Sequence, residues 1–187
     1  VLMKCLFDFI VIPKGERYNN IKKVGDSELI LNSEIFHHKF TNRQAIVKKI
    51  PLAISTPIKV NDEIIVHHNV FRRYHDIRGR EKNGRSFFNE NEFLIEHDQV
   101  YAYKRNGKWN CLDGYCFVQP IKNTNFLSDQ KEEPLKGIVK YTDGTVEKDC
   151  LVGFVPDSEY EFTIDGIRMY RVLSKFITIK YEYQGNE

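Results

Sequence analysis

Several features that identify common functional classes are scarce or missing in this chain of 187 residues. No apolar run approaches the roughly 20 residues that a membrane-spanning helix needs. The opening segment, residues 1–4, is too short for a signal peptide. A basic excess is also missing, because 28 Lys and Arg face 26 Asp and Glu, for a formal charge of +2. This balance argues against a dedicated nucleic-acid binder and gives no drive toward an anionic membrane.

Cysteine is scarce as well, with four residues at positions 5, 111, 116 and 150. Four cysteines in a chain of this length do not make a disulfide scaffold, and a reducing, cytosolic setting is the simpler interpretation. Cys111 and Cys116 lie on either side of an Asp113-Gly114 turn signal and could face each other. One such pair does not complete a zinc site.

The sequence motifs of common catalytic and cofactor sites are missing too. There is no C-x-x-C, H-E-x-x-H, G-x-S-x-G, P-loop or G-x-G-x-x-G pattern. The adjacent histidines His37-His38 and His67-His68 should point to opposite faces of a strand, which makes neither pair a natural chelate. We therefore expect no metal site, no cofactor and no enzymatic activity. An enzyme would need a polar site assembled from distant parts of the chain, for which the sequence gives no indication.

Aromatic and β-branched residues are abundant, including 13 Phe and 10 Tyr, and this composition favours strands. No stretch has the i, i+3, i+4, i+7 apolar spacing of an amphipathic helix. Apolar residues make up 41% of the chain, which is enough for a packed core. We predict an all-β chain with strands at 5–13, 43–50, 58–67, 70–74, 92–96 and 99–104. The charged segment 76–85 is expected to be a solvated hairpin tip rather than a phosphate site.

The second half of the chain repeats the first half in order. The matching segments are Cys5-Leu6 with Cys111-Leu112, residues 10–13 with 117–120, 45–48 with 137–140, 62–65 with 149–152, and 100–104 with 176–180. The offsets are 106, 107, 92, 87 and 76, and accidental matches would not keep one order with this trend. We predict two tandem small β-barrels, residues 1–106 and 107–187, joined near the Asn106-Gly107 turn signal. Closing each sheet would remove exposed strand edges.

The longest connection between predicted strands, Lys14 to Thr41, has no counterpart of similar length in the second half. It is polar and is broken by Gly15 and Gly25. A connection of this length without an obvious helix or paired strand is usually a functional or a disordered loop. Because the second repeat lacks this loop while keeping the flanking strands, the predicted barrel does not need the loop in order to fold.

One apolar triplet, Leu29-Ile30-Leu31, lies in the middle of this loop. The triplet is either a short strand that packs back on the barrel or a peptide anchor that stays mobile until a partner provides a groove. Burying three such side chains is worth roughly 1.5–3 kcal/mol each, and the cost of ordering a long loop opposes this gain. A single loop would therefore bind weakly. Several loops on one ring would bind well, because each later contact is effectively intramolecular.

Five segments occur in the order Leu6 to Ile12, Leu29 to Leu31, Arg43 to Val47, Lys59 to Val66, and Asn91 to Asp98. They read Leu-Phe-Asp-Phe-Ile-Val-Ile, Leu-Ile-Leu, Arg-Gln-Ala-Ile-Val, Lys-Val-Asn-Asp-Glu-Ile-Ile-Val and Asn-Glu-Phe-Leu-Ile-Glu-His-Asp. They resemble five segments of the ten-kilodalton co-chaperonins, the GroES family. In the same order, those segments are the Pro-Leu-x-Asp-Arg-Val-x-Val opening, the Ile-Val-Leu of the mobile loop, the Arg-Gly-x-Val, the Lys-Val-Gly-Asp-x-Val and the Glu-x-x-Val-Leu-Ile. The resemblance covers residues 5–104 and extends more weakly to 108–182 through the repeat.

This resemblance implies tandem GroES-like barrels that assemble as a homo-oligomer and cap a GroEL-like chaperonin ring. Leu29, Ile30 and Leu31 would insert into a groove of that ring, and the ATP would belong to the partner. The chain would assist protein folding without a cofactor of its own, and would bind neither nucleic acid nor membrane. Large tailed phages encode divergent members of this family, so the expected location is the cytoplasm, or the host cytoplasm for a phage protein.

The chain also departs from the family pattern. Ser27-Glu28 stands where the family has a Gly pair, and Asn61 stands where it has the Gly before Asp. Residues 51–57 are too few for the family's roof hairpin, and the second repeat has no apolar triplet, with residues 123–127 as the nearest match. The alternative is a structural or adaptor protein, for example a phage component, that has the same fold without capping activity. In that case the loop would pack on its own barrel or on a neighbour.

Overall fold

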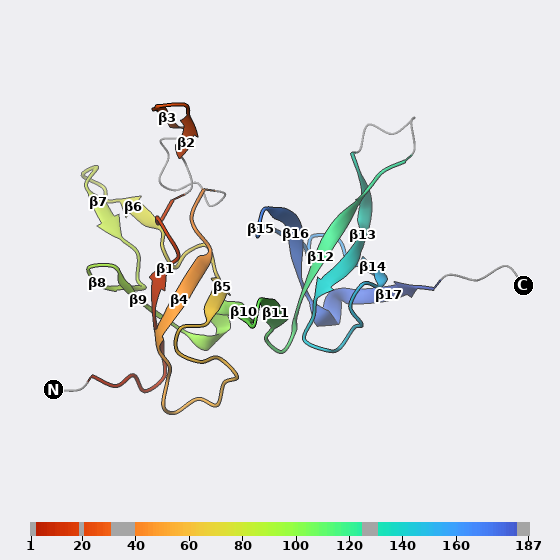
Figure 1. Ribbon diagram of the computed structural model, residues 1–187, viewed down its shortest axis with the longest axis horizontal. Helices are drawn as coiled ribbons and strands as arrows, with labels where there is room; N and C mark the ends of the chain where they lie inside the picture. Colours follow the sequence, from red (N-terminus) through yellow and green to blue (C-terminus); the bar gives the residue numbers. More distant parts are fainter. Residues whose placement is uncertain (1–2, 19–20, 31–39, 125–130, 183–187) are drawn as a thin grey trace, which may run out of the picture. The chain divides into compact units, whose positions relative to one another are not determined.

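The computed structural model describes residues 3–18, 21–30, 40–124 and 131–182. The described residues form antiparallel strands (Figure 1). They also contain two short 3-10 helices, η1 (His97–Gln99) and η2 (Ser174–Phe176). The prediction of an all-β chain is therefore confirmed. The chain divides into two compact units, Val1–Lys108 and Trp109–Glu187, whereas the sequence placed the boundary after residue 106. In the described part of the chain, no helix is long and apolar enough to span a membrane.

The first unit is built on one antiparallel sheet with the strand order β10-β5-β4-β1-β9-β8. These strands are β1 (Phe9–Pro13), β4 (Gln44–Lys49), β5 (Glu63–Val66), β8 (Phe87–Asn89), β9 (Glu92–Ile95) and β10 (Val100–Arg105). Two hairpins form separate two-stranded sheets, β2 (Ile21–Val24) with β3 (Ser27–Ile30) and β6 (Arg73–His75) with β7 (Glu81–Asn83). The short strand β11 (Lys108–Cys111) follows the turn at Asn106 and Gly107, both of which have positive φ.

The core of the first unit combines side chains from the centre of this sheet with side chains from the segment between β5 and β6. Phe9, Ile10 and Val11 of β1 are all fully buried, which fits the continuous apolar run in the sequence. Phe71 and Phe93 are also fully buried and meet edge to face, with ring centroids 4.8 Å apart. Such aromatic pairs add specific geometry to the gain from burial. The base of the long loop rests on this core.

The second unit is built on one antiparallel sheet with the strand order β15-β16-β12-β13-β14-β17. Its strands are β12 (Tyr115–Lys122), β13 (Glu132–Tyr141), β14 (Leu151–Phe154), β15 (Tyr160–Ile164), β16 (Ile167–Leu173) and β17 (Ile177–Tyr181). Its core contains the buried side chains of Val118, Val139, Val152, Phe154 and Val172.

The two sheets repeat the same topology. Read from the opposite edge, the second sheet has the order β17-β14-β13-β12-β16-β15, which matches the order of the six strands from β10 to β8. The first sheet has β11 beside β10 in addition. The registers agree as well, because Val11 pairs with Val47 in the first sheet and Val118 pairs with Val139 in the second. The register shifts before Val11 and again before Val118. The sequence offsets of 107 and 92 for these strands therefore hold in the structure.

The register corrects two of the sequence matches by one residue. Ala45 pairs with Ile64 and Gly137 pairs with Val152, so the offset at β5 and β14 is 88, and not 87. By residue type, Asp62 matches Asp149. In the structure Asn61 and Asp149 are equivalent, because both have positive φ and both donate their backbone N–H to a matched strand carbonyl. The match of β10 with β17 shifts in the same way, to an offset of 77.

Two predictions about the first unit change with the structure. The connection from Lys14 to Thr41 is not an irregular loop throughout, because it contains the paired hairpin β2–β3. The rings of His67 and His68 stack with centroids 4.2 Å apart and do not point to opposite faces, because β5 ends at Val66 and these residues lie beyond it. Among the described residues each sheet ends in two edge strands, so a closed barrel stays a prediction.

Candidate functional site

Both ends of the long loop are held together where they leave the sheet. Backbone hydrogen bonds join Lys14 N–H to the Gln44 carbonyl (2.9 Å) and Asn42 N–H to the Arg17 carbonyl (2.8 Å). Tyr18 and Thr41 form a further antiparallel bridge. The buried Asn42 amide donates to the carbonyls of Lys14 and Glu16, at 2.9 and 2.8 Å. The loop therefore starts from a fixed base that extends the pairing of β1 and β4.

Arg17 ties this base to a second part of the chain. Its guanidinium donates from Nε (3.1 Å) and Nη2 (2.9 Å) to the carbonyl of Phe71, and from Nη1 to Asn83 Oδ1 (2.8 Å). The guanidinium carbon also lies 4.9 Å from the centre of the Phe93 ring. Burial and the neighbouring Arg73 charge lower the pKa of Arg17 below its ordinary value. One side chain thus connects the loop, the β6–β7 hairpin and the aromatic core.

Tyr18 makes a second connection to the same hairpin. Its hydroxyl oxygen accepts a hydrogen bond of 2.6 Å from the backbone N–H of Arg73. The Arg73 side chain in turn forms an ion pair of 2.8 Å with Glu81 on the opposite strand. The ends of the long loop and of the β6–β7 hairpin therefore share one hydrogen-bonded base.

The β2–β3 hairpin continues the loop beyond this base. Lys22 pairs with Leu29 and Val24 pairs with Ser27, so Val24 and Leu29 lie on the same face. Val24 is 58% exposed and Leu29 is 54% exposed. In the part of the chain that the structure describes, the two strands pair only with each other. The hairpin thus presents an apolar pair to solvent on a clamped base.

The structure places the predicted binding triplet only in part. Leu29 lies in β3 and is exposed, Ile30 is the last residue of that strand, and Leu31 lies outside the described residues. Sequence reasoning missed Val24 as a companion of Leu29. The signal was present, since Gly25-Asp26 is a turn dipeptide between two short segments of strand length.

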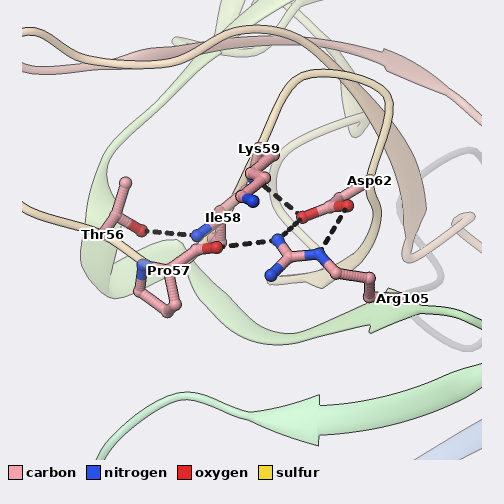
Figure 2. Close-up of polar contacts among 6 residues, drawn as sticks. All are labelled: Thr56, Pro57, Ile58, Lys59, Asp62 and Arg105. Atoms are coloured by element: carbon pink, nitrogen blue, oxygen red, sulfur yellow. Dashed lines mark hydrogen bonds and ion pairs between the residues drawn. The ribbon is translucent and has the colours of Figure 1, made fainter.

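A second polar cluster in the first unit has a structural role. Figure 2 shows Asp62 accepting hydrogen bonds from the Lys59 backbone (2.8 Å) and from the Arg105 guanidinium. Arg105 also donates to the Pro57 carbonyl at 2.7 Å, and the bond to Asp62 raises its pKa. The cluster uses its donors and acceptors to fix the turn between residues 57 and 62.

The second unit contains a cluster with nucleophilic side chains but no base. Cys116 Sγ lies 3.3 Å from Ser174 Oγ, which donates to Asp143 at 2.7 Å. Asp143 also accepts from the backbone of Gly114 (2.8 Å) and Thr145 (2.9 Å). Burial opposes ionisation of Asp143, yet these hydrogen bonds outweigh it and hold the pKa below its usual range. All six histidines precede residue 98, so this unit has no imidazole that could act as a base. The hydrogen bonds of Asp143 therefore have a structural role and stabilise the fold of the second unit.

Neither metal chemistry nor family membership gives a further assignment. No three His, Cys, Asp or Glu side chains come together as a metal site in the described ranges. Burial and the nearby Cys116 raise the pKa of Cys111 far above its ordinary value, which makes it an unreactive thiol. A scan against models of protein families finds no match, and no curated protein matches the chain.

Proposed function

We propose that the chain is a GroES-like co-chaperonin that docks on a chaperonin ring through the β2–β3 hairpin. The observation that carries the proposal is the exposed apolar pair Val24 and Leu29 on a hairpin whose base is clamped by Arg17 and Asn42. Single exposed apolar side chains are common on protein surfaces, but Val24 and Leu29 share one face of the hairpin and so form a small apolar patch. Leu29, Ile30 and Leu31 remain the proposed contact residues, and Val24 joins them.

The energetics favour a repeated contact. Burying one Leu side chain that is now half exposed contributes less than the roughly 1.5–3 kcal/mol of a full transfer. One hairpin per molecule would therefore bind weakly. A homo-oligomeric ring of the chain would present several hairpins at once, and each later contact would be effectively intramolecular. This is the reason for including oligomerisation in the proposal.

The scaffold in this proposal is a tandem of GroES-like barrels. The shared strand order and register of the two units support a duplication of one domain. Only the first copy carries the long loop, so each chain contributes one docking hairpin. ATP hydrolysis belongs to the chaperonin, and the chain acts in the cytoplasm without a cofactor of its own.

The direct test is ATP-dependent complex formation with a GroEL-type chaperonin ring, followed by chaperonin-assisted refolding of a client. Leu29→Ser combined with Ile30→Ser should reduce both by about tenfold or more, because two apolar contacts are lost from every hairpin. Leu52→Ser is the matched control, since Leu52 is 61% exposed but lies outside the hairpin. Unchanged chaperonin-assisted refolding with the double variant would contradict the docking role of Leu29 and Ile30.

The structural or adaptor alternative makes different predictions for the same protein. It expects no complex with a chaperonin at any nucleotide condition, and resistance to limited proteolysis between Arg17 and Lys39. Native mass and a protease digest distinguish the two functions. A ring that is cleaved in this segment supports the co-chaperonin, and a resistant monomer supports the adaptor.

A further inference from the structure

Two connections of the first unit are longer than the equivalent connections of the second unit. The difference in residue number between equivalent paired residues of the two units falls from 107 before the long loop to 92 after it. The second copy is therefore 15 residues shorter there. The offset falls again from 88 to 77 between β5 and β9, where the first copy holds the β6–β7 hairpin. The shared sheet needs neither segment, because the second unit builds the same strand order without them.

These two extra segments are joined to each other. Arg17 and Tyr18 belong to the long loop, and their partners Phe71, Arg73 and Asn83 flank or form the β6–β7 hairpin. Four hydrogen bonds of 2.6 to 3.1 Å connect the segments at their bases. Two unrelated insertions would have no reason to share a base, whereas one composite surface would require it.

The β6–β7 hairpin is strongly basic. Residues 72–85 contain six Lys or Arg and two acidic residues, in a chain whose net charge is only +2. The side chains of Arg78, Arg80 and Lys82 are exposed and form no ion pair with another described residue. Asp76 fixes the turn by accepting the backbone N–H groups of Arg78 and Arg80, both at 2.9 Å. The basic side chains are therefore carried by an ordered turn and are available to a partner.

The tip of this hairpin also carries an apolar residue. Ile77 is fully exposed between Asp76 and Arg78. An isolated exposed Ile needs no explanation, but here it lies among unpaired basic side chains on a segment that the sheet does not need. A nucleic-acid surface would favour further basic residues over an exposed Ile, and the rest of the chain is slightly acidic.

We propose that the β2–β3 and β6–β7 hairpins form one interaction surface, in which Val24, Leu29 and Ile77 supply apolar contacts and Arg78 and Arg80 supply charge. The partner it fits is a protein surface with an apolar groove bordered by carboxylates. The inference rests on the proposed function for the identity of the partner as a chaperonin, but its chemistry can be tested separately. Charge of this kind chiefly sets the association rate and the salt dependence of binding.

The test uses the chain of 187 residues and two kinds of probe. One probe is a GroEL-type ring with ATP. The other is a synthetic peptide with a Leu-rich centre flanked by Glu runs, together with its Gln-flanked analogue and an oligodeoxythymidine. Arg78→Glu combined with Arg80→Glu is compared with Lys48→Glu combined with Lys148→Glu, which gives the same change in net charge at exposed positions elsewhere. Thermal unfolding checks that both variants fold.

The expected result is that the Arg78→Glu/Arg80→Glu variant binds the ring and the Glu-flanked peptide about tenfold more weakly near 50 mM salt, with the difference shrinking near 300 mM. The control variant and Leu52→Ser should bind both probes like the unchanged protein. Leu29→Ser should weaken both at either salt concentration. If the peptide follows this pattern but the ring does not bind at all, the co-chaperonin function fails and the composite surface stands.

Several outcomes would overturn the inference. Equal binding by the Arg78→Glu/Arg80→Glu variant and the unchanged protein would remove the basic hairpin from the surface. An equal loss in the Lys48→Glu/Lys148→Glu variant would reduce the effect to net charge. Equal binding of the Gln-flanked and Glu-flanked peptides would exclude carboxylates as the partner of Arg78 and Arg80, and no binding of the peptides or of the ring would remove the composite surface altogether. Tighter binding of the oligodeoxythymidine, lost in the Arg78→Glu/Arg80→Glu variant, would assign the hairpin to nucleic acid.

Discussion

Arg17 concentrates more connections than any single feature of the sequence suggested. It satisfies the Phe71 carbonyl with two N–H groups, binds Asn83 and covers the Phe93 ring. In the sequence it is one basic residue in a polar segment, and its partners lie more than 50 residues away. Side-chain contacts of this range leave no local pattern, which is why sequence reasoning could not find them.

Replacing Arg17 by Met should lower the free energy of unfolding by about 1–3 kcal/mol, because the Phe71 carbonyl loses its donors in a partly buried site. Urea unfolding followed by circular dichroism measures the change. Arg78→Met is the matched control, since that side chain is exposed and unpaired among the described residues, and its effect should stay within about 0.5 kcal/mol. Similar losses in both variants would contradict the clamp.

Asp143 should make the stability of the chain depend on acidic pH. Its pKa in the folded state lies below the ordinary value, because hydrogen bonds from Thr145, Ser174 and Gly114 outweigh the effect of burial. Its ionised form therefore stabilises the fold above the unfolded pKa of about 3.9. This contribution is lost as the pH falls through the folded pKa.

The expected outcome for Asp143→Asn is a loss of stability at neutral pH that shrinks as the pH falls below about 4. Urea unfolding at a series of pH values from neutral to acidic measures this difference. Asp113→Asn, an exposed carboxylate in the same unit, is the control. A constant difference between Asp143→Asn and the unchanged protein at every pH would argue against the assignment.

At the scale of elements, the sequence located β4, β9 and β10 to within one residue at either end, but it predicted no strand at β15 or β16. The apolar side chains of β1 are buried in a continuous run, and those of β4 are buried at every second position. The equivalent strands β12 and β13 could be found from the sequence repeat. The one-residue error at β5 arose because Asp62 was matched to Asp149 by residue type. What the two units share at this point is a positive φ, at Asn61 and Asp149.

The β2–β3 hairpin escaped prediction for a different reason. Its two strands are four residues each, and every residue from Lys22 to Leu29 is exposed, so burial imposes no alternation on the sequence. Only the Gly25-Asp26 turn signals a reversal. A pattern-based assignment works through burial, and it has little to detect in a hairpin that packs on nothing among the described residues.

Gly25→Val should loosen the β2–β3 hairpin without unfolding the unit. Gly25 has a φ of +61°, a conformation that costs a residue with a side chain about 1–2 kcal/mol. Hydrogen exchange of the amides in β2 and β3 should become about tenfold faster. The global free energy of unfolding should stay within about 0.5 kcal/mol, because the hairpin strands pair only with each other in the described ranges.

Gly137→Val provides the contrast within the second unit. A Cβ atom at Gly137 would lie 2.9 Å from the Gln119 carbonyl oxygen in the centre of the sheet. We expect a loss of about 1–3 kcal/mol in global stability from overpacking. If Gly25→Val produced a global loss of the same size, the hairpin would be part of the cooperative fold, and its independence would be disproved.

The whole molecule consists of one sheet topology built twice, with the extra segments attached to the first copy. The second unit supplies an internal control that few single-domain proteins offer, because it reveals which parts of the first unit the sheet requires. The long loop and the β6–β7 hairpin are not among them. Their cost in ordering must therefore be offset by something other than the stability of the sheet, and binding is the natural candidate.

Because the sheet does not require the long loop, most of this loop should be removable from the chain. Replacing residues 19–39 by a short Gly-Ser linker should leave both units folded, because Tyr18 and Thr41 are already bridged and a linker can close the turn between them. Shortening a loop lowers its closure cost by only about 0.6 kcal/mol per halving of length. The free energy of unfolding should therefore change by about 1 kcal/mol or less, while ATP-dependent binding to a chaperonin ring should be lost. A variant that unfolds would make the loop part of the scaffold, and a variant that still binds the ring would move the docking site away from the hairpin.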